Sequence, residues 1–215
     1  MKKLVIFPKG GLGNRIRVIF SYWCFCKKHN INLVIFWKKN KYCFGHFLDY
    51  FQEIPGVIFN QEKFMLSTSQ KLNKIDNQEY IESLKYLKIN KNLQEIIDKY
   101  LKMIGKFDAV HIRRTDHVSL AKVNGKYVDL VEFERFIEGR ENVFLATDCY
   151  ETQRYLIEKY KQVKVFEKIN YSKKLRQTSL RNSVIDMFIC IEGKEFMGTP
   201  FSSFSRLIEN KRSLF

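Results

Sequence analysis

The sequence lacks a hydrophobic run long enough to cross a membrane. Its longest apolar stretch, residues 16–36, is interrupted by the polar segment KKHN, whereas a membrane-spanning helix needs about 20 predominantly apolar residues in a row. The apolar run near the N-terminus, residues 4–7, is too short for a signal peptide. We therefore expect a cytoplasmic protein without a membrane span.

Cysteine pairs and metal-ligand clusters are missing as well. The five cysteines make an odd number, none forms a CxxC pair, and no histidine is spaced to complete a zinc site. No pair of acidic residues indicates a bound metal ion. These absences predict mostly buried thiols in a reducing compartment and no metal cofactor.

Acidic residues are few compared with basic ones. The chain has 38 Lys and Arg against 23 Asp and Glu, a net charge of +15, which suits a nucleic acid, a membrane surface or an anionic substrate. The lysines are scattered among asparagine and isoleucine without a basic block, so a compositional bias explains the charge equally well. A nucleic-acid-binding module stays an alternative function, but its base-contacting and stacking motifs are missing.

The N-terminal region has the pattern of a strand–helix–strand unit. Residues 3–8 and 32–37 are short apolar runs that predict buried strands. A glycine-rich turn separates them, followed by an apolar segment that we expect to be a helix capped by Asn14. The crossover between the strands should be right-handed. Residues 38–92 show no clear pattern.

The C-terminal region alternates between strand and helix patterns. A helix over 93–105 has its apolar positions on one face and ends at Gly105. After it, the pattern predicts strands over 108–113, 142–148, 163–167 and 195–199, and helices over 129–139, 150–161, 179–193 and 202–210. This alternation predicts an α/β fold of two Rossmann-like halves with parallel sheets, divided into residues 1–104 and 105–215.

The turn GGLGNR (10–15) fits no nucleotide-binding fingerprint. The third glycine of a dinucleotide motif is replaced by Ile16, the second strand is followed by WKKN without an acidic residue, and no Gly-Lys-Ser/Thr is present. Gly11 and Gly13 still allow a ligand to approach the backbone, and a helix N-terminus offers N–H groups to an anion. A tight turn without any ligand is an equally good interpretation.

The segment AVHIRRTD (109–116) places charged residues where a buried strand ends. Ligands of open α/β sheets bind outside the carboxyl ends of the strands, and the planar guanidinium of Arg113 or Arg114 suits phosphate. The alternative is a solvated strand end with Arg114 paired to Asp116. We interpret His111 as a hydrogen-bonded core residue rather than a catalytic base.

Two further strand ends carry polar groups. One strand ends at Thr147 and Asp148, and Asp148 either caps the following helix or binds a ligand. The last strand leads to Ser202 and Ser203, which either cap the last helix or hold a phosphate with its N–H groups. Together with the arginines, these strand ends predict a nucleotide-phosphate site in the C-terminal half. Asp186, in an apolar helix, needs a partner, and we expect an arginine.

Four stretches of the chain resemble, in order, the motifs of fucosyltransferases: GGLGNRI, HIRRTD, FLATD and SVIDMF…FMGTPFSSFS. The resemblance is to α1,2- and α1,6-fucosyltransferases and protein O-fucosyltransferases. It implies a GT-B-like fold and an inverting, metal-independent transfer of fucose from GDP-fucose to a glycan or other hydroxyl acceptor. A catalytically inactive nucleotide-binding module of the same fold stays an alternative. One departure is Thr115, which stands where the α1,2 pattern has glycine.

The resemblance also implies roles for single residues. Arg113 would bind the donor pyrophosphate and aid departure of the leaving group, with Arg114 and Asp116 nearby. Residues 105–215 would form the donor-binding domain with its terminal helix, and residues 1–104 the acceptor side. The acceptor's base would be Asp116, Asp49 or Glu53. The implied donor-binding set is Gly11, Gly13, Asn14, His111, Arg113, Thr147, Asp148, Asp186, Ser202, Ser203 and Phe204.

Overall fold

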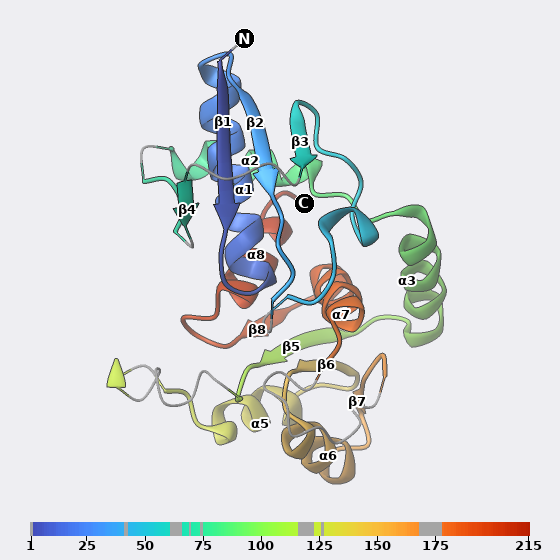
Figure 1. Cartoon of the computed structure of the whole chain (residues 1–215). Coiled ribbons are helices and arrows are strands. Elements are labelled where there is room, and N and C mark those ends of the chain that lie inside the picture. The colour runs from blue at the N-terminus through green and yellow to red at the C-terminus, as the bar shows by residue number, and fades with distance from the viewer. Residues whose placement is uncertain are drawn as a thin grey trace. The chain divides into compact units, whose positions relative to one another are not determined.

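The computed structural model describes residues 2–40, 43–60, 66–68, 70–73, 75–115, 123–125, 127–167 and 178–215. The chain forms two compact units, which we call the N-terminal unit (Met1–Lys91 with Ser213–Phe215) and the C-terminal unit (Asn92–Arg212). Each unit contains one four-stranded sheet (Figure 1).

The N-terminal unit is built on a parallel sheet of order β3-β2-β1-β4. Its strands are β1 (Lys3–Pro8), β2 (Asn32–Phe36), β3 (Val57–Asn60) and β4 (Leu66–Thr68). The predicted strands 3–8 and 32–37 are therefore present, the second ending one residue earlier. β3 and β4 lie within residues 38–92, where the sequence showed no pattern, because both strands are short and one is polar.

Helix α1 (Leu12–Lys28) joins β1 to β2 and is buried on most of its surface. The expected cap is wrong. Gly11 occupies the N-cap position without a side-chain hydrogen bond, while Asn14 lies inside the first turn. The rest of the unit's helical structure is short: η1 (Phe47–Asp49), α2 (Asn77–Ser83) and η2 (Leu84–Tyr86).

The C-terminal unit has a second parallel sheet, of order β7-β6-β5-β8. Its strands are β5 (Asp108–Ile112), β6 (Val143–Thr147), β7 (Val163–Lys164) and β8 (Phe196–Gly198). Its helices are α3 (Lys91–Ile104), α5 (Leu130–Glu138), α6 (Tyr150–Lys159), α7 (Leu180–Glu192) and α8 (Ser203–Arg212). The predicted α/β fold with two parallel sheets is confirmed.

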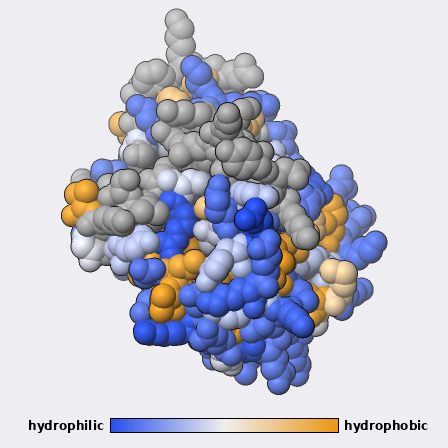
Figure 2. Space-filling view, turned by 90° about the horizontal axis from the view of Figure 1, so that it is seen from below, coloured by the Kyte–Doolittle hydropathy of each residue, from blue (hydrophilic) through white to orange (hydrophobic). Residues whose placement is uncertain are grey.

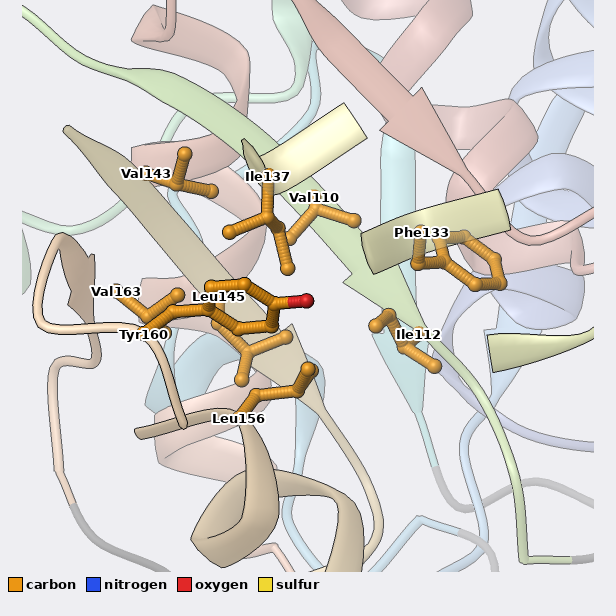
Figure 3. Packing of buried hydrophobic residues seen from close by; sticks show 9 residues of the cluster. All are labelled: Val110, Ile112, Phe133, Ile137, Val143, Leu145, Leu156, Tyr160 and Val163. Carbon is orange, nitrogen blue, oxygen red and sulfur yellow. The ribbon is translucent and has the colours of Figure 1, made fainter. Parts of the chain in front are cut away.

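The two faces of this second sheet are covered by different helices. Alternate strand residues such as Val110 and Ile112 point toward α5 and α6, where they pack in a buried cluster (Figure 3). The opposite face carries His111 toward α8 and Phe144 toward α3. This alternation is what the strand pattern predicted.

The boundary between the units lies earlier than we expected, between Lys91 and Asn92 instead of between 104 and 105. Tyr100 explains the difference, because its ring packs edge-on against Phe144 of β6 and against Phe166, at centroid distances of 5.8 and 5.5 Å. Helix α3 is thereby part of the second core. It ends as predicted, with Gly105 at a positive φ of 71°.

The described helices include none that is long and apolar enough to cross a membrane. None of the five cysteines forms a disulfide, and all but Cys149 are buried. The face shown in Figure 2 is mostly hydrophilic, with hydrophobic residues in small separate patches.

Candidate functional site

Three neighbouring strands of the C-terminal unit end at one edge of the sheet. Ile112 of β5 is in register with Thr147 of β6, and His111 is in register with Gly198 of β8. Because all three strands are parallel, the segments that follow them leave the sheet side by side. The structure thus brings together the strand ends that the sequence singled out.

Asp148 anchors the segment that follows β5. Its carboxylate accepts hydrogen bonds from the Arg114 backbone N–H at 2.9 Å and from the Thr115 hydroxyl at 2.7 Å. The side chain is only 8% exposed. Asp148 does not cap α6, whose N-cap is Cys149, so the capping interpretation is wrong. The hydroxyl of Thr115, the residue that departs from the α1,2 pattern, is used in this contact.

Thr199 anchors the same segment from the other side. Its hydroxyl accepts from the Arg113 backbone N–H and donates to the His111 carbonyl, both at 2.9 Å. The Thr199 N–H in turn donates to the Ser205 hydroxyl at 2.9 Å, and Ser205 lies 2.7 Å from His111 Nδ1. The backbone of Arg113 and Arg114 is therefore held between β8 and β6.

His111 is a buried member of this network, 6% exposed. The Ser205 hydroxyl accepts from the Thr199 N–H and also forms a hydrogen bond with His111 Nδ1, whose direction is set by the tautomer of the ring. The Phe204 ring packs against the imidazole at a centroid distance of 4.8 Å. This geometry agrees with the interpretation of His111 as a hydrogen-bonded core residue.

The turn between β8 and α8 presents a helix N-terminus at the same edge. The buried Ser202 accepts from the Ser205 N–H at 3.3 Å, as an N-cap residue does. Ser203 begins the helix and is only partly buried. Phe201 has a positive φ of 60° and is 50% exposed. A strained non-glycine residue of this kind is typical of functional sites.

The two arginines are placed differently. The Arg114 guanidinium donates to the Val128 carbonyl at 3.2 Å and lies over the rings of Tyr127 and Phe133, at 5.2 and 5.9 Å. Its Nη2 is buried and has no hydrogen-bond partner among the described residues. Arg114 is thus packed against the start of α5, while Arg113 lies partly buried at the strand end.

Two other predicted residues are Thr147 and Asp186. The Thr147 hydroxyl accepts from the Cys149 N–H at 3.3 Å and is buried. Asp186 lies partly buried on α7 and forms no ion pair within the described parts of the chain, so these parts do not supply the arginine partner that we expected. Burial raises the pKa of the Asp186 carboxyl well above its usual value, and the charge of Glu167 raises it further.

The glycine turn of the N-terminal unit lies at the carboxyl edge of the other sheet (Figure 1). Gly10 has a positive φ of 86°, and a Cβ there would lie 3.0 Å from the Asn14 Nδ2, so the turn needs glycine. Gly11 and Gly13 are buried. Asn14 accepts from Arg17 Nη2 at 3.0 Å. The first N–H groups of α1 have no partner inside the helix, as at any helix start.

The three candidate bases are Asp49, Glu53 and Asp116. Asp49 is exposed and accepts from the His46 backbone N–H at 2.8 Å. Glu53 is exposed. Asp116 lies outside the described residues. Within the described ranges, no group of three His, Cys, Asp or Glu is arranged to hold a metal ion.

Sequence reasoning missed the residues that hold the site in shape. Thr115, Thr199 and Ser205 all lie in segments that the sequence had singled out, yet only their neighbours were selected. Their signal is a hydroxyl one to three positions after a strand end or a helix start. Arg15 was also missed, and its signal is a charged residue within the apolar helix that follows the glycine turn.

A family model described as GDP-fucose protein O-fucosyltransferase matches residues 42–215. None of the curated proteins compared matches the sequence.

Solved structures share the fold at low sequence identity. Fucosyltransferase NodZ from Bradyrhizobium has a TM-score of 0.66 and 14% identity over 97% of this chain and 93% of that chain. NodZ alpha-1,6-fucosyltransferase soaked with GDP-fucose has a TM-score of 0.68 and 15% identity over 98% and 92%. POFUT1 in complex with GDP has a TM-score of 0.68 and 14% identity over 99% and 94%. The predicted GT-B-like fold is thereby confirmed.

The family match covers most of the chain, including the ends of β5, β6 and β8 in the C-terminal unit. The chain belongs to the GDP-fucose protein O-fucosyltransferase family of glycosyltransferases.

Proposed function

We propose that the protein transfers fucose from GDP-fucose to a hydroxyl group of an acceptor, with inversion at the anomeric carbon and without a metal ion. Family membership supports the donor and the reaction. The observation that carries the assignment is the double anchoring of the Arg113–Thr115 backbone by Asp148 and Thr199. Such anchoring preorganises an arginine at the edge where α/β sheets bind ligands.

Donor binding falls to the C-terminal unit in this proposal. Arg113 donates to the diphosphate, and the N-terminus of α8 with Ser202 and Ser203 offers further N–H and hydroxyl groups. His111, Thr147 and Phe204 line or support this pocket, and Asp186 supports it from α7. The N-terminal unit provides the acceptor side, and Gly11, Gly13 and Asn14 of its glycine turn are candidates for further contacts with the donor.

The chemistry is a displacement at the anomeric carbon. The acceptor oxygen forms a bond to that carbon while the bond from carbon to the diphosphate oxygen breaks, and the electron pair leaves with GDP. Arg113 stabilises the developing negative charge, which in other enzymes a metal ion offsets. The acceptor proton passes to a carboxylate, for which Asp116, Asp49 and Glu53 are the candidates.

Arg114 has a different role from the one first expected. Its contacts with Val128, Tyr127 and Phe133 direct it to α5, so we assign it to positioning the loop instead of binding the donor directly. Arg113 alone then supplies the cationic donor contact from this segment.

The test is the calorimetric GDP affinity and the fucose turnover of Arg113→Ala and Arg113→Lys. A charge-assisted hydrogen bond contributes about 1.5–3 kcal/mol, and loss of transition-state stabilisation as well should lower turnover by about a hundredfold in Arg113→Ala. Arg113→Lys should recover little, because an ammonium cannot form two parallel bonds.

Arg135→Ala is the matched control, since Arg135 is an exposed arginine on α5 whose contact is to Glu132 of the same helix. It should leave both quantities unchanged. Unchanged affinity and turnover in a folded Arg113→Ala protein would mean that this arginine does not bind the donor. GDP binding by the wild type without any transfer would favour the inactive nucleotide-binding alternative.

A further inference from the structure

Among the described residues of the N-terminal unit, Arg15 is the most deeply buried charged side chain. It lies in the first turns of α1 and is 0% exposed. Its guanidinium donates from Nε to the Gly10 carbonyl at 3.0 Å and from Nη1 to the Lys38 carbonyl at 2.8 Å. The flat group lies over the Trp37 ring, 4.6 Å from its centre. Two nitrogens of the guanidinium and one of its faces are therefore in contact with other groups.

The positive charge of Arg15 is poorly compensated. No ion pair joins Arg15 to a carboxylate among the residues that the structure describes. Its Nη2 is buried and has no hydrogen-bond partner in the same set. Burial accordingly lowers the pKa of Arg15, although an arginine stays protonated in proteins. Removal of a charge from water is unfavourable. An apolar side chain of similar volume at this position would therefore give the folded protein an equal or greater stability.

The two carbonyls that Arg15 binds belong to different loops. Gly10 lies in the turn between β1 and α1, and Lys38 follows β2. Both loops leave the carboxyl edge of the N-terminal sheet, at the arrowheads of β1 and β2 in Figure 1. Trp37 extends the connection, because its Nε1 donates to the Gly45 carbonyl at 2.7 Å. One rigid side chain thus fixes the glycine turn against the chain that leaves the neighbouring strand.

We propose that Arg15 is a positioning residue for the transfer reaction. It holds the turn at Gly10–Gly13 in a fixed position relative to the segment at Lys38. It also places a buried positive charge beside the N-terminus of α1. The N–H groups at the start of α1 then keep the orientation that the reacting substrates need. This inference rests on the proposed function, and it assigns Arg15 to turnover and not to GDP affinity, which belongs to the C-terminal unit.

The test compares Arg15→Met and Arg15→Lys with the wild type. Methionine keeps the volume and removes the charge and both hydrogen bonds, so we expect an unfolding midpoint close to that of the wild type. Turnover should fall at least tenfold, and GDP affinity should stay within about twofold. Lysine keeps the charge but cannot reach both carbonyls, so its turnover should be intermediate.

Arg212→Gln provides the control for a purely structural arginine. Arg212 donates to the Cys190, Ile191 and Lys194 carbonyls of the C-terminal unit. Its loss should lower the unfolding midpoint and leave turnover unchanged at temperatures where the protein is folded. Normal turnover in folded Arg15→Met, or a parallel fall in GDP affinity and turnover, would overturn the inference.

A second measurement does not depend on activity. Hydrogen exchange at residues 9–14 and 38–40 should be faster in Arg15→Met than in the wild type, and unchanged in Arg212→Gln. Equal exchange in Arg15→Met and the wild type would also overturn the positioning role. Absence of fucose transfer by the wild type would instead contradict the proposed function, while the exchange measurement would still decide the role of Arg15.

Discussion

Replacement of Asp148 tests whether the anchoring of the Arg113–Thr115 segment matters for the donor. Asp148→Ala removes the two hydrogen bonds that its carboxylate accepts from the Arg114 N–H and the Thr115 hydroxyl. Bonds to a charged group contribute about 1.5–3 kcal/mol each. The free energy of unfolding should therefore fall by roughly 3–6 kcal/mol, a large part of the total stability of a typical domain.

The stability loss can be divided between the two bonds. Thr115→Val removes only the hydroxyl contact, so its cost should be about half of that of Asp148→Ala. In a double-mutant cycle the two substitutions should show a coupling of about 1–3 kcal/mol, because the two side chains are in direct contact. Urea unfolding of the wild type, both single variants and the double variant measures this coupling.

The functional consequence of losing Asp148 is that the backbone at Arg113 is no longer fixed on one side. We expect GDP affinity in Asp148→Ala to fall at least tenfold at temperatures where the variant is folded. The control is Asp76→Ala, because Asp76 also accepts two hydrogen bonds, in its case from the backbone N–H groups of Gln78 and Glu79 at the start of α2. It should cost about 1 kcal/mol of stability as a lost helix cap and leave GDP affinity unchanged. A folded Asp148→Ala protein that binds GDP like the wild type would refute the reasoning.

Two further predictions concern pH and metal ions. Burial raises the pKa of Asp186, so the folded protein favours the neutral carboxyl. The folded state therefore loses stability as pH rises above about 4, the pKa that this carboxyl has in the unfolded chain. Asp186→Asn should therefore gain stability relative to the wild type as pH rises above about 4 in urea unfolding, and a difference that does not change with pH would contradict this. A chelator should leave GDP affinity and turnover unchanged, since Arg113 and the α8 N-terminus offset the charge; loss of turnover that manganese restores would point to a metal-dependent mechanism.

The elements that the sequence predicted well are those whose local pattern agrees with their tertiary role. The apolar runs at 3–8 and 108–113 became β1 and β5, because buried parallel strands need apolar side chains on both faces. The edge strands Val57–Asn60 and Leu66–Thr68 were missed. Each is short and gains its structure from pairing with β2 or β1, which a local pattern does not contain.

The site shows the same division between local and long-range information. A residue before a helix, such as Asp148, is predicted equally well as a cap or as a ligand. Only the register of β5 with β6 brings its carboxylate to Arg114 and Thr115. Asp186 shows the limit of a local rule, because a buried carboxylate indicates a partner without saying which residue supplies it, and the charge that the described residues place near Asp186 is that of Glu167.

The central claim is that the C-terminal unit binds a guanine nucleotide sugar, and a ligand that binds the folded state raises the unfolding temperature. The most direct measurement is therefore a thermal unfolding series with GDP, GDP-fucose, UDP, ADP and NAD at equal concentration. We predict that GDP and GDP-fucose raise the midpoint more than the other compounds. A larger rise with UDP or NAD, together with no response to the guanine nucleotides, would contradict the assignment of the donor.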